Sequence, residues 1–321
     1  MNLSRRRFVV GAAAVAAGGC ATMPKNEVDP NLSVFISDLH VRAGESYQKD
    51  HLAKVVDAIL AMRPPPKNVV CFGDIAYHCG LPEEYRTSRS ILQPLVDAGI
   101  TLTFGMGNHD RRSAFLDAWP EYRARNLLDG HIVSRVDLGA CDLLMLDGLQ
   151  GTDDRARNDM GPVSGAMSRR HQEWLVEALK QLKRPAFIAS HYTYGDTYAK
   201  GEMDVLGEPL MKTLLKCPLA VGYVYGHAHR WTKGWHHEGW GKDARELRTL
   251  CLPSTGHWGD IGYVVFRTSP GRAVAELYQN DYFFPSPPGP GKWSPDARSP
   301  VWDRIVAENR GQTMHWMWNN G

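Results

Sequence analysis

The sequence predicts an α/β fold in which short strands alternate with helices. Three apolar runs are separated by segments whose apolar residues recur at helical spacing, which predicts parallel strands joined by crossover helices. The runs are residues 32–37, 69–72 and 100–104, and the helical segments between them are residues 48–62 and 83–98. Two alternating runs then follow, residues 132–136 and 141–146, with the turn 137–140 between them. This is a hairpin pattern, so we expect the sheet to become mixed there.

The second half of the sequence continues with further strands. A helix is expected after Ser168, and apolar runs at residues 185–189 and 219–225 predict two more buried strands. Three later runs, at residues 247–252, 262–266 and 273–278, are typical of a closing antiparallel meander. Residues 148–167, rich in Gly, Asp and Arg, predict a long loop near the strand ends. His236 and His237 are interpreted as part of a solvated turn.

The division of the chain follows its composition. Residues 1–19 combine a basic start with a short, mildly apolar run that is too short to span a bilayer. Residues 20–31 form a polar linker, and residues 32–284 form the α/β domain. Residues 285–321 turn to Pro, Gly and Trp, and we expect a tail that is held over the domain by its aromatic rings.

Composition excludes several other classes of protein. The 321 residues are 43% hydrophobic and 22% charged, which is ordinary for a soluble globular protein. The formal net charge of +2 is small and evenly spread, so no nucleic-acid binding is indicated. The sequence does not define an oligomeric state.

Polar side chains follow each apolar run at the point where a strand should end. In chain order they are Asp38 and His40, Asp74, Asn108 and His109, His191, and His227 with His229. Strand ends meet at the carboxyl edge of an α/β sheet, where ligands of such sheets usually bind. Any one of these groups alone has an ordinary structural explanation, since Gly-Asn is a common turn and Asp110 could cap the helix at residues 111–119.

The donors among these residues indicate a metal centre. Seven side chains offer N or O atoms of the kind that bind borderline cations: Asp38, His40, Asp74, Asn108, His191, His227 and His229. Seven donors are too many for one tetrahedral ion, so we expect two cations with a shared carboxylate. Mn, Fe, Zn and Co are the candidates, as divalent or trivalent ions. His109 stands beside the cluster as a proton carrier.

The order of the blocks resembles the calcineurin-like metallophosphoesterase superfamily. Its pattern is Asp-x-His, Gly-Asp, Gly-Asn-His-Asp/Glu, His and Gly-His-x-His, and all five blocks occur between residue 34 and about residue 266. The resemblance implies a four-layer α/β/β/α sandwich of two mixed sheets, with the dimetal site at the strand carboxyl ends. It also implies phosphoester hydrolysis, by a phosphodiesterase or a phosphatase, with a hydroxide between the metals as nucleophile.

The resemblance also implies a role for each residue. Asp38, His40 and His229 would bind the first metal, Asn108, His191 and His227 the second, and Asp74 both. His109 and Asp110 are assigned to catalysis, with His109 stabilising the transition state and protonating the leaving oxygen. Candidates for substrate binding are Arg111, Tyr77, His78 and His257, although Arg111 could equally be a solvated helix charge.

Tyr77 departs from one branch of the superfamily and leaves an alternative open. In the serine/threonine phosphatases an Asp three residues after the bridging Asp orients the catalytic histidine, and Tyr77 stands at that place. Gly73 to Tyr77 instead matches the Gly-Asp-x-x-Tyr block of purple acid phosphatases, in which the tyrosine binds iron. Those enzymes lack a histidine at the position of His40, so we expect a supporting or pocket role for Tyr77.

Among the subgroups, the bacterial cyclic-nucleotide and glycerophosphodiester phosphodiesterases are the most similar. The Asp-x-His start, the short Gly-Asn-His-Asp block and residues 80–85 carry this likeness. Besides a purple-type acid phosphatase, an alternative of another class is a lipoprotein that binds metal without catalysis.

The N-terminus resembles an export signal. Residues 4–9, Ser-Arg-Arg-x-Phe-Val, resemble the twin-arginine signal, and Ala17 to Cys20 resembles a lipid-attachment box with Ala17 where Leu is usual. These resemblances imply a periplasmic or membrane-anchored lipoprotein with Cys20 as the candidate lipid anchor. Simple cleavage nearby and an ordinary amphipathic N-terminus are the alternatives. Because twin-arginine substrates cross the membrane already folded, we expect no essential disulfide among the six cysteines.

Overall fold

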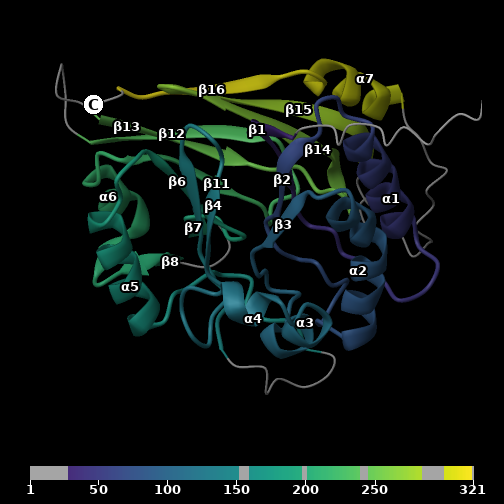
Figure 1. Cartoon of the computed structure of the whole chain (residues 1–321), viewed down its shortest axis with the longest axis horizontal. Helices are drawn as coiled ribbons and strands as arrows, with labels where there is room; N and C mark the ends of the chain where they lie inside the picture. The colour runs from purple at the N-terminus through teal and green to yellow at the C-terminus, as the bar shows by residue number, and fades with distance from the viewer. Residues whose placement is uncertain (1–27, 152–158, 197–200, 239–244, 284–299, 320–321) are drawn as a thin grey trace, which may run out of the picture.

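Two six-stranded sheets face each other between two layers of helices in this computed structural model (Figure 1). The structure describes residues 28–151, 159–196, 201–238, 245–283 and 300–319. This arrangement confirms the four-layer α/β/β/α sandwich of two mixed sheets.

The first sheet has the order β16-β15-β14-β1-β2-β3. Its parallel part consists of β1 (Asp29–Ile36), β2 (Pro66–Cys71) and β3 (Thr101–Phe104). Its antiparallel part consists of β14 (Gly259–Ser269), β15 (Arg272–Phe283) and β16 (Thr313–Met317). Helices α1 (Tyr47–Leu60) and α2 (Pro82–Asp97) cover the outer face (Figure 1). The short helices α3 (Arg112–Ala118) and α4 (Tyr122–Arg125) follow β3.

The second sheet has the order β12-β13-β11-β6-β5-β4. The parallel strands are β5 (Asp142–Met145), β6 (Ala186–Ser190), β11 (Ala220–Tyr225) and β13 (Arg245–Cys251). Antiparallel β4 (Ser134–Asp137) and β12 (Thr232–Glu238) form the two edges. Helices α5 (Arg169–Lys180) and α6 (Leu210–Leu215) cover the outer face (Figure 1). Two small pairs, β7 (Gly195–Asp196) with β8 (Gly201–Glu202) and β9 (Asp204–Val205) with β10 (Glu208–Pro209), lie between β6 and α6 in the chain.

Local sequence explains where the helices begin and end. Ser168 caps α5, because its hydroxyl oxygen accepts a hydrogen bond from the backbone N–H of His171 at 3.2 Å. Helix α2 starts with Pro82, and the Glu84 carboxylate accepts from the N–H of Leu81 at 2.9 Å. Helix α1 ends at Leu60, shortly before the run of prolines that begins at Pro64.

Two expectations about the later part of the chain were wrong, and a third segment is more regular than expected. The run at 247–252 belongs to β13 of the second sheet, not to a meander with β14 and β15, because alternation of apolar residues does not specify which sheet a strand joins. His236 and His237 lie within β12 rather than in a turn. The C-terminal segment supplies α7 (Pro300–Asn309) and the edge strand β16, so its described part extends the domain.

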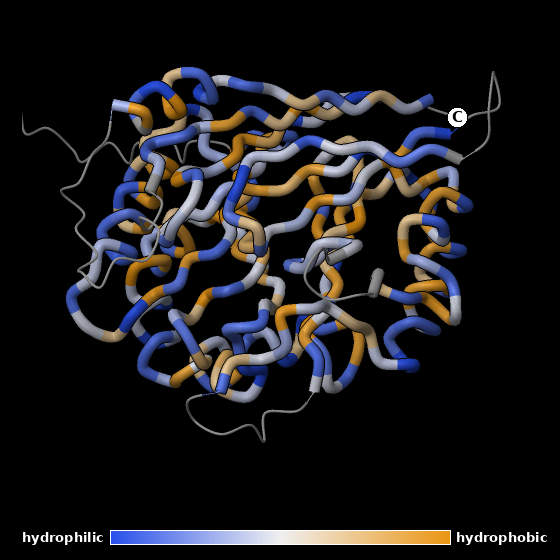
Figure 2. The backbone as a smooth tube through the Cα atoms, turned by 180° about the vertical axis from the view of Figure 1, so that it is seen from behind, coloured by the Kyte–Doolittle hydropathy of each residue, from blue (hydrophilic) through white to orange (hydrophobic). Residues whose placement is uncertain are grey.

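The alternation of side chains along the strands divides the core into two regions. In β1 and β2, Phe35 and Val70 point into the space between the sheets, whereas Val34 and Val69 join the cluster that packs against the helices. Because both faces of these strands are covered, their C-terminal halves, residues 34–36 and 69–71, are apolar and buried, and hydrophobic segments recur along the strands in Figure 2. Phe187 of β6 links the sheets, with its ring centroid 5.1 Å from Phe266 and 5.1 Å from Trp316.

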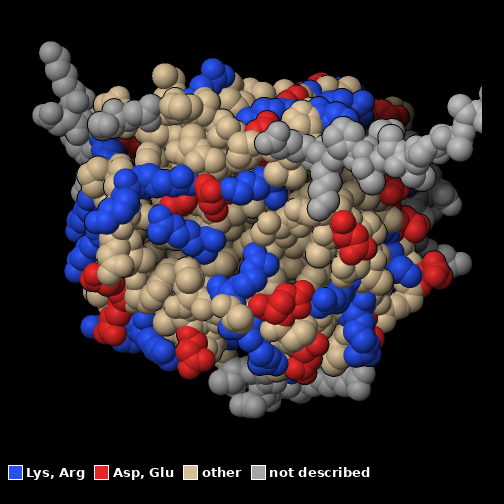
Figure 3. All heavy atoms as spheres, viewed as in Figure 1, with Lys and Arg blue, Asp and Glu red and all other residues tan. Residues whose placement is uncertain are grey.

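The surface agrees with the small net charge. On the face seen in Figure 3, Lys and Arg side chains are interspersed with Asp and Glu, without one large patch of either sign. Among the described helices none is long and apolar enough to cross a membrane. The five cysteines in the described part of the chain, Cys71, Cys79, Cys141, Cys217 and Cys251, are free thiols.

We predict that Phe187→Ala lowers the free energy of unfolding by about 3–5 kcal/mol, because it leaves a cavity between the two sheets. The matched control is Trp235→Ala in the same sheet, where the side chain is 62% exposed and should contribute less than about 1 kcal/mol. Urea unfolding followed by circular dichroism measures both. Equal losses in the two variants would contradict the assignment of Phe187 to the inter-sheet core.

Candidate metal centre

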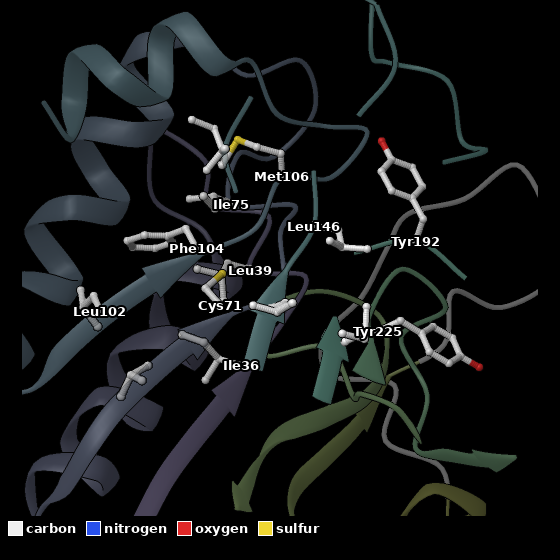
Figure 4. Packing of buried hydrophobic residues seen from close by; sticks show 14 of the residues in the cluster. Ile36, Leu39, Cys71, Ile75, Leu102, Phe104, Met106, Leu146, Tyr192 and Tyr225 are labelled. Atoms are coloured by element: carbon white, nitrogen blue, oxygen red, sulfur yellow. The ribbon is translucent and has the colours of Figure 1, made fainter. Parts of the chain in front are cut away.

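The strand ends of both sheets converge on one edge of the sandwich. The first sheet supplies Asp38 and His40 after β1, Asp74 after β2 and Asn108 after β3, and the second supplies His191 after β6 and His227 with His229 after β11. The apolar layer beneath this edge is drawn in Figure 4. There Ile36, Cys71 and Phe104 at the ends of the first-sheet strands lie opposite Leu146 and Tyr225 of the second.

Four of the predicted ligands form a first donor set. Asp38, His40, Asp74 and His229 each offer one ligand atom, and these atoms all lie within 4.8 Å of one another. The Nε2 atoms of His40 and His229 are 3.3 Å apart, and His229 Nε2 is 3.1 Å from Asp38 Oδ1. Three of these side chains come from the first sheet and one from the second, so the site exists only when the sheets are packed together.

A second donor set shares one member with the first. It consists of Asp74, His191 and His227, whose ligand atoms also lie within 4.8 Å of one another. His191 Nε2 is 3.1 Å from His227 Nδ1. The Oδ2 atom of Asp74 is 3.5 Å from His40 Nε2 of the first set and 3.3 Å from His191 Nε2 of the second. A single carboxylate oxygen therefore faces both sets.

Asn108, the remaining predicted ligand, carries an unsatisfied buried oxygen. Its Oδ1 atom is buried and has no hydrogen-bond partner among the described residues, whereas its Nδ2 lies 3.9 Å from the sulfur of Met160. An unsatisfied buried amide oxygen is costly unless it binds a cation or water. The donor chemistry of both sets, imidazole nitrogen with carboxylate and amide oxygen, fits two divalent cations.

Backbone carbonyls fix the orientation of three ligand histidines. The Nδ1 atoms of His40, His191 and His229 lie 3.1, 3.0 and 3.0 Å from the carbonyl oxygens of Tyr77, Phe72 and Trp258. A carbonyl accepts only, so each Nδ1 carries a proton, and in the neutral ring Nε2 presents its lone pair to the cluster. These carbonyl partners could not be predicted from the sequence, because a backbone group leaves no sign in the residue type.

Five of the predicted ligands have a left-handed backbone conformation. Apart from Leu206, the described non-glycine residues with positive φ are all predicted ligands, namely Asp38, His40, Asp74, His227 and His229, with φ between 45° and 70°. L-residues rarely adopt this conformation, and it concentrates at functional sites. Gly107 allows the required approach, since a Cβ there would lie 2.1 Å from Asp74 Oδ1.

Burial and mutual charge set the protonation of the cluster. Burial opposes ionisation of Asp74, but His191 and His109 outweigh it and hold the pKa of its carboxyl well below its usual range. Burial and then the neighbouring His191 lower the pKa of His227 to about 4, so this ring is neutral at pH 7. For His191, burial is outweighed by Asp74, which raises the pKa to about 9. A cation that enters the second set therefore displaces the proton of His191.

His109 and Asp110, both predicted to be catalytic, have different places. His109 Nε2 lies 3.9 Å from Asp74 Oδ2, its side chain is 18% exposed, and its Nδ1 has no hydrogen-bond partner in the described part of the chain. Asp110 is fully buried and accepts from the backbone N–H groups of Gly107, Ile75 and Ala76. Asp110 thus holds together the turns after β2 and β3, and its catalytic role stays a prediction.

The predicted substrate-binding residues lie around the first donor set with one exception. The ring of His257 lies 4.4 Å from that of His40 and 5.8 Å from that of Tyr77, and the exposed His78 lies 5.9 Å from His109. Arg111 is directed elsewhere, since its Nε donates to the carbonyl of Cys79 at 2.6 Å and its Nη2 to that of Asp159 at 3.3 Å. These contacts make Arg111 a support for the neighbouring loops.

Arg112, the second arginine after the motif, also supports the site. Its Nε and Nη2 atoms donate to both oxygens of the buried Asp147, at 2.6 and 2.9 Å. Asp147 in turn accepts from the N–H groups of Ile132 and Leu149 at 2.7 and 3.1 Å. The pair secures the loop after β5, and Asp147 gave no signal in the sequence, because its partner follows a different strand.

The fold is an α/β/β/α sandwich, and two donor sets that share a carboxylate lie at its strand ends. Together they define a metal-dependent phosphoester hydrolase. The chain belongs to the calcineurin-like phosphoesterase family, whose profile matches residues 33–231. The family uses two divalent metal ions, in agreement with the two donor sets. No curated protein matches the sequence.

The chain is similar to solved structures. A dimetal phosphatase from Danio rerio superposes with a TM-score of 0.58 at 15% identity, over 78% of this chain and 96% of its own, and at this identity the likeness shows the fold alone. The protein TT1561 of Thermus thermophilus has a TM-score of 0.46 at 12% identity, over 74% of this chain and 94% of its own.

We predict that single substitutions separate the two cation sites. His40→Ala should lower the bound metal from about two ions per chain to about one by removing a ligand of the first set, and His227→Ala should do so from the second. Asp74→Ala should lose most of both, because it removes the shared oxygen. Elemental analysis of purified protein measures the ratio. A ratio unchanged in Asp74→Ala would contradict the shared carboxylate.

Proposed function

We propose that this phosphoester hydrolase acts on small phosphoesters, with phosphodiesters preferred, and that Asp38, His40, Asp74, Asn108, His191, His227 and His229 hold its two metal ions. The observation that carries the proposal is the position of Asp74 Oδ2, 3.3 and 3.5 Å from imidazole nitrogens of two donor sets. The preference for diesters rests on the likeness of the Asp-x-His start and the short Gly-Asn-His-Asp block to bacterial phosphodiesterases.

The chain arranges the reaction around this centre. When bound, two cations would screen the phosphate oxygens and lower the pKa of a water, so that hydroxide would be available near neutral pH to attack phosphorus. His109 is the proton donor to the oxygen that leaves when the P–O ester bond breaks, and it then recovers a proton from solvent. The backbone N–H of His109 donates to Asp74 Oδ1 at 2.9 Å. This hydrogen bond fixes the position of His109 relative to the shared ligand Asp74.

Tyr77 supports this reading over a purple-type phosphatase. His40 is present in the first donor set, and the backbone carbonyl of Tyr77 is what orients it. The Tyr77 ring packs under the guanidinium of Arg42, whose Cζ lies 4.5 Å from the ring centroid. Tyr77 therefore serves as a wall of the site. A visible tyrosinate-to-iron absorption band, lost in Tyr77→Phe, would favour the alternative.

We predict that the protein, loaded with Mn²⁺ or Zn²⁺, hydrolyses bis(p-nitrophenyl) phosphate faster than p-nitrophenyl phosphate. His109→Ala should reduce kcat by about 10²–10⁴-fold, the usual contribution of a general acid, while both ions stay bound. Asn108→Ala should remove most of the rate by weakening the second site. Initial rates and metal content are measured on the same preparations.

The exposed His237 on β12 provides a matched control for these variants. His237→Ala should keep both rate and metal content. Full activity in both Asn108→Ala and His109→Ala would reject the proposed mechanism. Bound metal without any hydrolysis of a panel of monoesters, diesters and cyclic nucleotides would instead favour the non-catalytic lipoprotein.

We further propose export by the twin-arginine route to the periplasm or to a membrane surface, with lipid on Cys20. Residues 1–27, including Cys20, lie outside the described residues, and the support for this proposal is the motif Ser-Arg-Arg-x-Phe-Val. Replacing Arg5 and Arg6 with Lys should retain the protein in the cytoplasm, and Cys20→Ala should abolish labelling by a palmitate analogue. Cell fractionation and the labelling itself test the two parts separately.

A further inference from the structure

A loop outside the matched family region borders the metal centre. Residues 254–258 lie beyond residue 231, where the family match ends. The N–H of Thr255 donates to the carbonyl of Ser37 at 2.7 Å, and the hydroxyl of Ser254 donates to that of Asp38 at 2.8 Å. At Gly256 a Cβ would lie 2.2 Å from the Leu39 carbonyl oxygen, so only glycine allows this approach. The loop is thereby held against the segment that carries the first ligands.

This loop places a further imidazole next to the first donor set. The ring of His257 lies 4.4 Å from that of His40 and 5.7 Å from that of His229, yet His257 belongs to neither donor set. The ring of His109 lies 4.6 Å from that of His40. Two imidazoles outside the donor sets therefore adjoin the ligand His40, one from each of two separate loops.

Two residues at the start of α1 define the tautomer of His257. Its Nδ1 lies 3.1 Å from the hydroxyl oxygen of Tyr47 and 3.4 Å from Nε2 of Gln48. An amide nitrogen donates only, so Nδ1 is the acceptor and the neutral ring carries its proton on Nε2. Gln48 is only 2% exposed, which makes this contact a buried one. The Nε2–H is therefore on the side of the ring away from Nδ1 and its two partners.

We propose that His257 donates a hydrogen bond from Nε2 to the phosphoryl group of the substrate, and that Tyr47 and Gln48 are positioning residues that keep it a donor. The proposal rests on the proposed phosphoester hydrolysis. The two imidazoles beside His40 then have different roles. His109 protonates the leaving oxygen, and His257 donates a hydrogen bond to an oxygen that stays on phosphorus. The substrate class that it serves is any ester with a charged phosphoryl oxygen.

Kinetics of the metal-loaded enzyme provide the first test. His257→Ala should lower kcat/KM for bis(p-nitrophenyl) phosphate by about 10- to 100-fold, the worth of one hydrogen bond to a charged group. The loss should lie mainly in KM, because the bond exists before and during the reaction, whereas His109→Ala should lower mainly kcat. His257→Gln, which keeps an N–H donor, should recover most of the loss. Tyr47→Phe should cause a smaller loss of about 2- to 10-fold, since Gln48 remains.

The tautomer of His257 can be measured directly, without reference to enzyme activity. Long-range proton–nitrogen NMR spectra should show His257 protonated at Nε2, and this state should weaken in the double variant Tyr47→Phe with Gln48→Leu. A proton on Nδ1 in the wild-type protein would overturn the proposal. So would unchanged kinetics in His257→Ala, or loss of bound metal from that variant, because the latter would make His257 a support of the cation site.

Inorganic phosphate separates this proposal from the proposed function. Calorimetric titration of the metal-loaded protein should show phosphate binding that is about 10- to 100-fold weaker in His257→Ala and unchanged in His237→Gln. If the wild-type protein hydrolyses no ester but shows this difference, the proposed function fails while the donor role stands. If hydrolysis is normal and phosphate binds both proteins equally, the donor role alone is rejected.

Discussion

The metal centre depends on sharp left-handed turns by which two sheets present their strand ends to each other. Asp38, His40, Asp74, His227 and His229 all have positive φ, and each such residue costs about 1–3 kcal/mol relative to ordinary backbone. Hydrogen bonds that cross between strand ends hold the turns. The N–H of Asp38 donates to the carbonyl of Gly73, that of His40 to the carbonyl of Asp74, and that of His227 to the Asp38 carboxylate. The unusual conformation is thus supported by the surrounding structure before any cation binds.

Charge explains why such an arrangement needs cations. The carboxylates of Asp38 and Asp74 are buried, and burial lowers the pKa of His40 and His227 beside them, so these two rings carry no charge to balance the carboxylates at pH 7. Divalent ions held by the two donor sets would supply positive charge next to these carboxylates. Binding of metal and cohesion of the two sheets therefore reinforce each other, because each donor set draws residues from both.

Much of the fold and the ligand set followed from the sequence, because both rest on local pattern. Helical spacing, period-two strands and polar residues directly after them are read from neighbouring positions, as for Asp74 after β2 or His191 after β6. Most contacts that the sequence did not predict join residues distant in the chain. Asp110 accepts from backbone amides of another turn, β13 joins the sheet opposite to β14, and the partner Tyr47 of His257 lies 210 residues earlier. The residue types at these positions do not predict such contacts.

The edge strand β16 completes the interior between the two sheets from a part of the chain far beyond the ligands. Its Trp316 is 1% exposed and packs against Phe187 and Phe266, with Nε1 donating to the Arg248 carbonyl at 3.4 Å. Because β16 pairs with β15, a chain shortened before residue 313 would leave the backbone groups of β15 unpaired at a sheet edge and would open the aromatic core between the sheets.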